Sequence, residues 1–208
     1  MAAPAGSAAD QQGIDDVVAR ETGRKAIHVG VTTACAALAW YAPAAWARAL
    51  LAAGAVLGLA LDLARLRLPP VGRIFQRTVG TLLRGRERRG LTGATTMAIG
   101  FATTALVFPT RIAAVAFLYA GLADAAAALV GRSLGRHRFR GGKSVEGSIA
   151  FFLVALVLAA TLPGLDPLPA LGVAVAATLV EALPVPDDNW INPLAAAGLL
   201  WLGWTISG

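Results

Sequence analysis

The chain has 208 residues, of which 57% are hydrophobic and 14% are charged, and its mean hydropathy is +0.66. Soluble domains have about 45–50% apolar and about 25% charged residues, so this composition excludes an ordinary water-soluble globule. At about 20 residues per membrane crossing, the length holds at most about eight or nine spans and leaves no room for a separate soluble domain. The single cysteine, Cys35, excludes an internal disulfide bond.

The hydropathy pattern predicts an all-α, polytopic membrane protein with about seven transmembrane helices. Residues 1–23 are small, polar and partly acidic, and they are expected to form a flexible tail rather than a signal peptide. Residues 24–208 then form a single transmembrane domain. Its apolar runs cover residues 26–41, 44–64, 92–108, 111–131, 148–163, 168–184 and 190–206.

Basic residues set the expected orientation. Eight arginines lie in residues 65–91, where apolar residues recur at near-helical spacing, which predicts an amphipathic helix in the membrane interface. Every Lys and Arg except Arg48 and Arg111 falls on one side of the predicted spans. The positive-inside rule assigns that side, and with it the N-terminus, to the cytoplasm. Membrane topology and anionic lipid head groups account for the net charge of +6 without a nucleic-acid partner.

Asp124 is the most unusual residue of the predicted spans, because it lies inside the run 111–131. A carboxylate at such a depth costs about 2.5–3.5 kcal/mol on insertion scales. We therefore expect Asp124 to face a polar cavity, a cation or a partner side chain. The structural alternative is a buried ion pair that only fixes helix packing.

The segment 132–147 is predicted to be a cytoplasmic phosphate-binding loop. Its glycines allow backbone N–H groups to approach an anion, and Ser144 is placed to cap the next helix. It is not a Walker A loop, because His137 stands where that motif requires glycine. Arg138 is interpreted as a topology and lipid-contact residue. The residues expected to bind nucleotide here are Gly131, Arg132, Gly141, Gly142, Lys143 and Ser144.

Two further polar clusters are expected on the same membrane face. Arg24, Lys25 and His28 begin the first span and form a candidate anion site. Glu181 lies near the end of the sixth span, and Asp187, Asp188 and Asn189 precede the seventh, where they could equally cap a helix. Basic groups with several carboxylates are what a Mg²⁺–nucleotide site at the membrane surface requires.

In this order and on one face, the motifs resemble those of the polyprenol kinase family, which includes dolichol kinase, phytol kinase and CTP-dependent diacylglycerol kinase. The resemblance covers about residues 24–206 and includes the string 91–95 before the third span. One departure is Ala123, where the family would have glycine before the aspartate. The motifs that carry the resemblance are Arg24-Lys25-x-x-His28, Asp124 to Arg132, Gly142-Lys143-Ser144-x-Glu146-Gly147-Ser148 and Glu181 with Asp188-Asn189.

The resemblance implies transfer of the γ-phosphoryl group of CTP to the hydroxyl of a membrane lipid alcohol of the polyprenol, dolichol or phytol type. The implied cofactor is Mg²⁺, with Asp124, Glu146, Glu181 and Asp188 as candidate ligands. Lys143 and Arg132 would neutralise the phosphates, Arg24, Lys25 and Asn189 would also contact the nucleotide, and Asp187, Asp188 or His28 would accept the hydroxyl proton.

Two other functions remain open at this stage. A CTP-dependent cytidylyltransferase that makes a CDP-lipid would need the same Mg²⁺–CTP site, but it would release pyrophosphate. A transporter would show internal repeats and polar residues at the bilayer midplane, whereas here the polar residues gather at one face. Small residues on the spans, including Gly54, Gly58, Gly100 and Gly172, permit close helix pairing and thus a homo-oligomer.

Overall fold

The computed structural model describes residues 8–83, 85–139, 142–183 and 188–208. Within these ranges the chain is helical and contains no strand, which confirms the predicted all-α class; the one β-bridge joins Arg138 and Ser144. The α-helices are α1 (Ala8–Tyr41), α2 (Ala44–Arg67), α3 (Pro69–Val79), α4 (Gly93–Val107), α5 (Thr110–Leu118), α6 (Asp124–Ser133), α7 (Val145–Ala160), α8 (Pro167–Ala182) and α9 (Asp188–Ser207). Two short 3₁₀ turns, Gly80–Leu82 and Arg86–Arg88, precede α4, and a π-helical turn, Tyr119–Ala123, joins α5 to α6.

Local sequence signals explain where these helices begin. Thr92 and Ser144 cap α4 and α7, because each hydroxyl accepts a hydrogen bond from the backbone N–H three residues later. Pro43 and Pro109 stand directly before α2 and α5, and Pro167 is the first residue of α8. The described part of each apolar run predicted from the sequence is mainly helical. α1 begins at Ala8, so most of the expected flexible tail is helical too.

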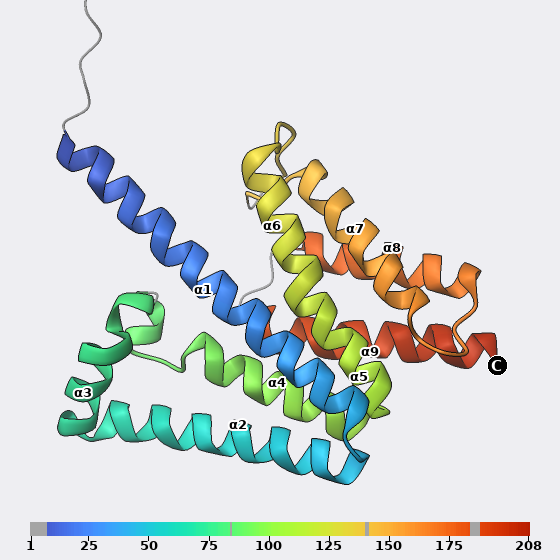
Figure 1. Cartoon of the computed structure of the whole chain (residues 1–208), viewed down its shortest axis with the longest axis horizontal. Helices are drawn as coiled ribbons and strands as arrows, with labels where there is room; N and C mark the ends of the chain where they lie inside the picture. The colour runs from blue at the N-terminus through green and yellow to red at the C-terminus, as the bar shows by residue number, and fades with distance from the viewer. Residues whose placement is uncertain (1–7, 84, 140–141, 184–187) are drawn as a thin grey trace, which may run out of the picture.

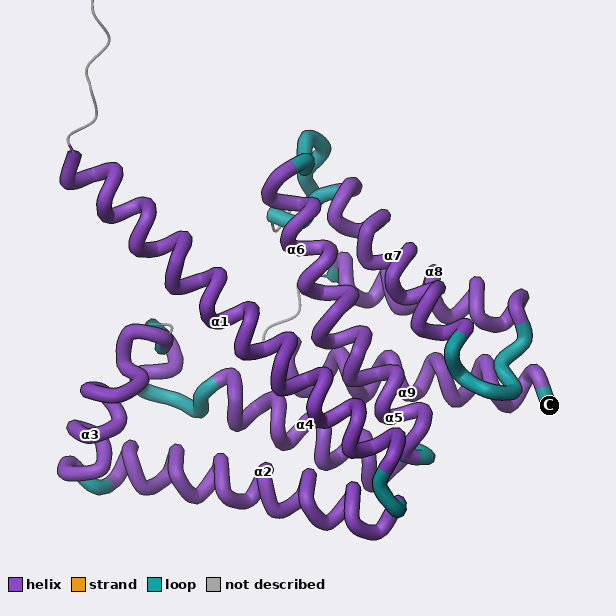
Figure 2. The backbone as a smooth tube through the Cα atoms, in the orientation of Figure 1, coloured by secondary structure: helices purple, strands orange, loops and turns teal. Residues whose placement is uncertain are grey.

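The helices form two packed groups that share α5 (Figures 1 and 2). One core joins α1, α2, α4 and α5, and the other joins α5 and α6 with α7, α8 and α9. In the second group, α7 packs against both α6 and α8. Their ends near Ser133, Val145 and Ala182 gather at one side of the second group, and the candidate site lies there.

The outer surface is apolar, as expected for a protein that associates with a membrane. Leu57, Leu106, Val157 and Leu179 are each more than half exposed on four different helices. Within the described residues, two helical segments are long and apolar enough to cross a bilayer, Ala44–Arg67 and Thr110–Ser133. α4, α7 and α8 are apolar but have only 15 or 16 residues, shorter than the about 20 of a typical span. The count of seven crossings stays a prediction.

A buried ionic network fixes the end of α2 against the segment before α4. Arg65 Nε donates to Asp62 Oδ1 at 2.5 Å, and Arg65 Nη2 donates to the carbonyls of Glu87 and Gly90. The other carboxylate oxygen, Asp62 Oδ2, accepts from Thr92 N at 2.8 Å and from Thr92 Oγ1 at 3.0 Å. Arg65 is thus a structural residue, while the interpretation of most arginines in 65–91 as topology and lipid-contact residues stays a prediction.

Candidate functional site

The π-helical turn places Asp124 at the start of α6. A π turn leaves backbone carbonyls without their usual helical partner. In this turn, Ala120 O accepts a hydrogen bond from His28 Nε2 at 3.0 Å. Thr32 packs against the same turn, where a Cβ on Gly121 would lie 2.0 Å from Thr32 Oγ1. α1 therefore supports the turn before Asp124, and His28 contacts the backbone there rather than a cavity.

The loop between α6 and α7 is held by its own hydrogen bonds. Phe139 N donates to Lys143 O at 2.8 Å, and Val145 N donates to His137 O at 2.9 Å. Gly142 closes the turn with a φ of +87°, a conformation that favours glycine. Arg138 donates to the carbonyls of Gly142 and Gly131. Arg138 thus braces this loop, and its interpretation as a topology and lipid-contact residue stays a prediction.

The loop, α6, α7 and the end of α8 enclose a polar cleft with an empty volume of about 550 Å³, part of it open to solvent. α6 and α7 approach each other closely along this cleft. Gly147 of α7 lies against Ala127 of α6, and a Cβ on Gly147 would be only 2.8 Å from Ala127 O. Most of the predicted phosphate-binding residues line this polar cleft. The lining residues that carry charge or polar groups are Asp124, Arg132, Arg138, Lys143, Ser144, Ser148 and Glu181.

Both carboxylates of the polar cleft are paired with lysines. Lys143 Nζ donates to Glu181 Oε1 at 2.7 Å and also to the Glu181 carbonyl oxygen. Lys25 Nζ lies 3.9 Å from Asp124 Oδ2, and the Asp124 side chain is 39% exposed. Arg132 is exposed on the rim of the polar cleft, with no side-chain partner among the described residues. The cleft therefore presents one partly exposed carboxylate, two exposed guanidinium groups (Arg132 and Arg138) and a lysine held at its wall.

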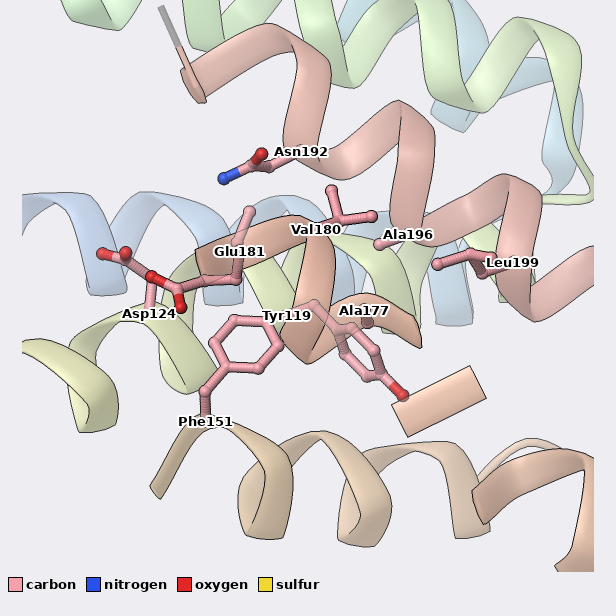
Figure 3. Close-up of a pocket in the computed structure, with 10 residues that line it drawn as sticks. Tyr119, Asp124, Phe151, Ala177, Val180, Glu181, Asn192, Ala196 and Leu199 are labelled. Carbon is pink, nitrogen blue, oxygen red and sulfur yellow. The ribbon is translucent and has the colours of Figure 1, made fainter. Parts of the chain in front are cut away.

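An apolar cavity with an empty volume of about 340 Å³ lies next to the polar cleft. Figure 3 shows Asp124, Glu181 and Asn192 toward one end of this apolar cavity, and Ala196 and Leu199 toward the other. The rings of Tyr119 and Phe151 line it as well, packed edge to face with centroids 6.2 Å apart. Asp124 and Glu181 line both spaces, so the two carboxylates stand at their junction.

Several predicted site residues lie elsewhere. Glu146 Oε1 accepts from His137 Nδ1 at 2.8 Å on the exposed side of the loop, and this hydrogen bond lowers the pKa of Glu146 to about 2. Asn189 Nδ2 donates to Gly93 O at 3.4 Å, on α4. Arg24 lines neither space. Gly141, Asp187 and the side chain of Asp188 lie outside the described residues.

The sequence analysis gave no site role to two residues, although Ser148 is part of one of its motifs. The Ser148 hydroxyl is buried in the wall of the polar cleft and has no hydrogen-bond partner among the described residues. Asn192 borders the apolar cavity, and no described residue bonds its amide. The signal for Ser148 was its place one turn after the capping Ser144, on the same helix face. No sequence signal distinguished Asn192 from Asn189.

The donor set fits a hard cation that a nucleotide helps to hold. Among the described residues no group of three His, Cys, Asp or Glu side chains is close enough to form a metal site alone. Mg²⁺ takes one or two carboxylates and completes its shell with water and substrate phosphates. Asp124, exposed in the polar cleft, offers such a carboxylate.

Comparisons with known proteins point to lipid phosphorylation. An uncharacterized protein of Rickettsia prowazekii is 32% identical over 103 residues, which are 48% of this chain and 50% of that protein. CTP-dependent diacylglycerol kinase 1 of Schizosaccharomyces pombe is 28% identical over 160 residues, which are 68% of this chain and 73% of the kinase. No family model and no solved structure matches the chain. The second likeness supports a distant relationship to a CTP-dependent lipid kinase.

Proposed function

We propose that this protein is a Mg²⁺-dependent kinase that transfers the γ-phosphoryl group of CTP to the hydroxyl of a membrane lipid alcohol. The observation that carries the proposal is the junction at Asp124 and Glu181. A polar cleft with basic side chains lies on one side of these carboxylates, and an apolar cavity lies on the other. A lipid kinase needs both spaces, because a charged donor and an apolar acceptor must meet at one point.

The polar cleft supplies the donor site. Arg132 and Lys143 would neutralise the triphosphate, and Ser148 would give its unpartnered hydroxyl to a phosphate oxygen. The N-terminus of α7, capped by Ser144, adds a positive dipole end near the same wall. Asp124 would hold Mg²⁺, which when bound offsets the negative charge of the phosphates. Phosphoryl transfer depends mainly on such positioning and charge neutralisation.

The reaction balances within this arrangement. The acceptor oxygen forms a bond to the γ-phosphorus, the bond between that phosphorus and the β-phosphate oxygen breaks, and CDP leaves. The hydroxyl proton passes to a carboxylate that borders both spaces, Asp124 or Glu181. Because basic residues cluster at this end of the helices, we place the polar cleft on the cytoplasmic side of a multi-pass chain.

The test uses purified protein with Mg²⁺, CTP labelled at either the γ or the α phosphorus, and a panel containing diacylglycerol and isoprenoid alcohols. We expect label in the lipid from γ-labelled CTP alone. Label from the α position would mean that the protein is a cytidylyltransferase and would overturn the proposal. The inactive control is Asp124→Asn, because asparagine is nearly isosteric with aspartate but lacks the anionic oxygens that Mg²⁺ requires. This variant should stay folded and lose about 100-fold or more of the transfer rate.

A further inference from the structure

The polar end of the apolar cavity contains a group that the donor site does not use. Asn192 lies near the start of α9, at the same end of the cavity as Asp124 and Glu181 (Figure 3). It is half-buried, and its amide has no hydrogen-bond partner among the described residues. The amide can therefore exchange a hydrogen bond with water for one with the polar group of a ligand.

The other walls of the apolar cavity are hydrocarbon. Beyond Asp124, Glu181 and Asn192 the lining consists of alanine, valine and leucine side chains with the rings of Tyr119 and Phe151. The Tyr119 hydroxyl is already engaged, because it donates to Ala155 O at 2.7 Å. Asn192 is thus the amide available to a ligand there. A complementary ligand has one hydroxyl, next to the carboxylates, on an otherwise apolar chain.

We infer that the apolar cavity is the acceptor site and that Asn192 selects the hydroxyl end of a lipid alcohol; this inference rests on the proposed function. The Asn192 amide donates a hydrogen bond to the hydroxyl oxygen, so that the hydroxyl proton faces the carboxylates. The apolar chain then extends from the polar end of the cavity toward Ala196 and Leu199. The cavity has a smaller empty volume than the polar cleft, so we expect it to hold only the end of the molecule. Diacylglycerol and isoprenoid alcohols share this chemistry.

The experiment measures binding rather than turnover, using the full-length chain in detergent. Thermal stabilisation is titrated with farnesol and with dioctanoylglycerol, each compared with the analogue in which hydrogen replaces the hydroxyl group. The wild-type protein should bind one of the alcohols about tenfold tighter than its deoxy analogue, the value of about one hydrogen bond. Asn192→Leu should abolish that preference and keep stabilisation by Mg²⁺–CTP.

Two further variants complete the experiment. Thr178→Val removes a half-buried hydroxyl from α8 that bonds only Ala174 O and lines neither space, so the preference for the alcohol should persist. Leu199→Trp fills the far end of the cavity and should weaken binding of alcohol and deoxy analogue alike; this variant tests the site even if Asn192→Leu does not fold.

The outcomes separate this inference from the proposed reaction. An unchanged preference in Asn192→Leu, no preference in the wild-type protein, or unchanged lipid binding in Leu199→Trp would each overturn the acceptor site. A hydroxyl preference that depends on Asn192, with no transfer of γ-label, would support the acceptor site and overturn the kinase proposal. The two arms of the titration show whether the acceptor is a glycerolipid or an isoprenoid.

Discussion

Two carboxylate–cation pairs in this chain are built from similar groups but differ in what surrounds them. In the Asp62–Arg65 pair the side chains are 2% and 5% exposed, and both oxygens of Asp62 accept hydrogen bonds from neighbouring protein groups. In the Glu181–Lys143 pair the side chains are 7% and 33% exposed, and both line the polar cleft. The first pair is enclosed by protein, whereas the second borders space that a ligand can enter.

The difference teaches how to separate structural from functional charges in a membrane protein. A buried pair whose groups are all satisfied holds elements together, and removal of one partner leaves a charge without solvation. A pair beside a cavity can exchange part of its hydrogen bonding for a ligand. Asp62 and Glu181 should therefore respond to substitution in different measurements, the first in stability and the second in nucleotide use.

The largest effect is expected for Asp62→Ala. This change leaves Arg65 buried without its counter-ion and removes the acceptor of Thr92 N, so the free energy of unfolding should fall by about 3–5 kcal/mol. Denaturation in detergent, followed by helical circular dichroism, measures it. The double variant Asp62→Leu with Arg65→Met removes both charges and should lose less. A single variant as stable as the double would contradict the structural role of this pair.

Lys143→Met should give the second largest effect, mainly on activity. The substitution keeps most of the length of the side chain but removes the charge that holds Glu181 and faces the phosphates. We expect kcat/KM for CTP to fall by about 100-fold. Stability should fall less than in Asp62→Ala, because Glu181 lines the polar cleft, which is partly open to solvent, whereas Arg65 is enclosed by protein. A larger loss of stability in Lys143→Met than in Asp62→Ala would contradict the distinction between the enclosed pair and the pair beside the cleft.

A smaller effect is expected for Ser148→Ala. No protein hydrogen bond is lost, since the buried hydroxyl has no partner, so the melting temperature should stay the same or rise. If the hydroxyl binds a phosphate oxygen, KM for CTP should rise about three- to tenfold. Steady-state kinetics and a thermal melt on the same preparation check both parts. An unchanged KM would remove Ser148 from the donor site.

The smallest effect is expected for Glu146→Gln. Glu146 faces His137 on the outside of the loop, so turnover should stay within about twofold of the wild-type value. The hydrogen bond from His137 lowers the pKa of Glu146 to about 2, below its ordinary 4.5. Its contribution to stability is therefore complete above about pH 5 and is lost as the pH falls toward 2. The pH–rate profiles of variant and wild type should coincide from pH 6 to 8, and a large loss there would restore Glu146 as a metal ligand.

Much of this architecture follows from the sequence because its signals are strong and local. Apolar runs, prolines and capping hydroxyls locate the helices, and the one-sided basic residues suggest that Asp124, Lys143 and Glu181 lie at one end of them. The structure does bring these three residues to one cleft. They converge because α7 packs against both α6 and α8.

The directions of individual side chains could not be predicted in the same way. Asn189 and Asn192 are three residues apart on α9, and their directions differ by about 60° around the helix axis. That rotation sends one amide to α4 and the other to the apolar cavity. Arg65 likewise resembled a topology signal because its partners, Glu87 and Gly90, come from a segment more than twenty residues away.

The π-helical turn before Asp124 has a consequence for how this segment tolerates change. A π turn is equivalent to one extra residue inserted in an α-helix. Deleting one residue from Tyr119–Ala123 would return the segment to a regular α-helix and leave Asp124 and α6 in nearly the same orientation about the axis. A one-residue deletion in a regular α-helical part has no such extra residue to remove, and it would rotate the residues that follow by about 100° about the axis. The direction of the Asp124 carboxylate should therefore survive the loss of one residue in this turn.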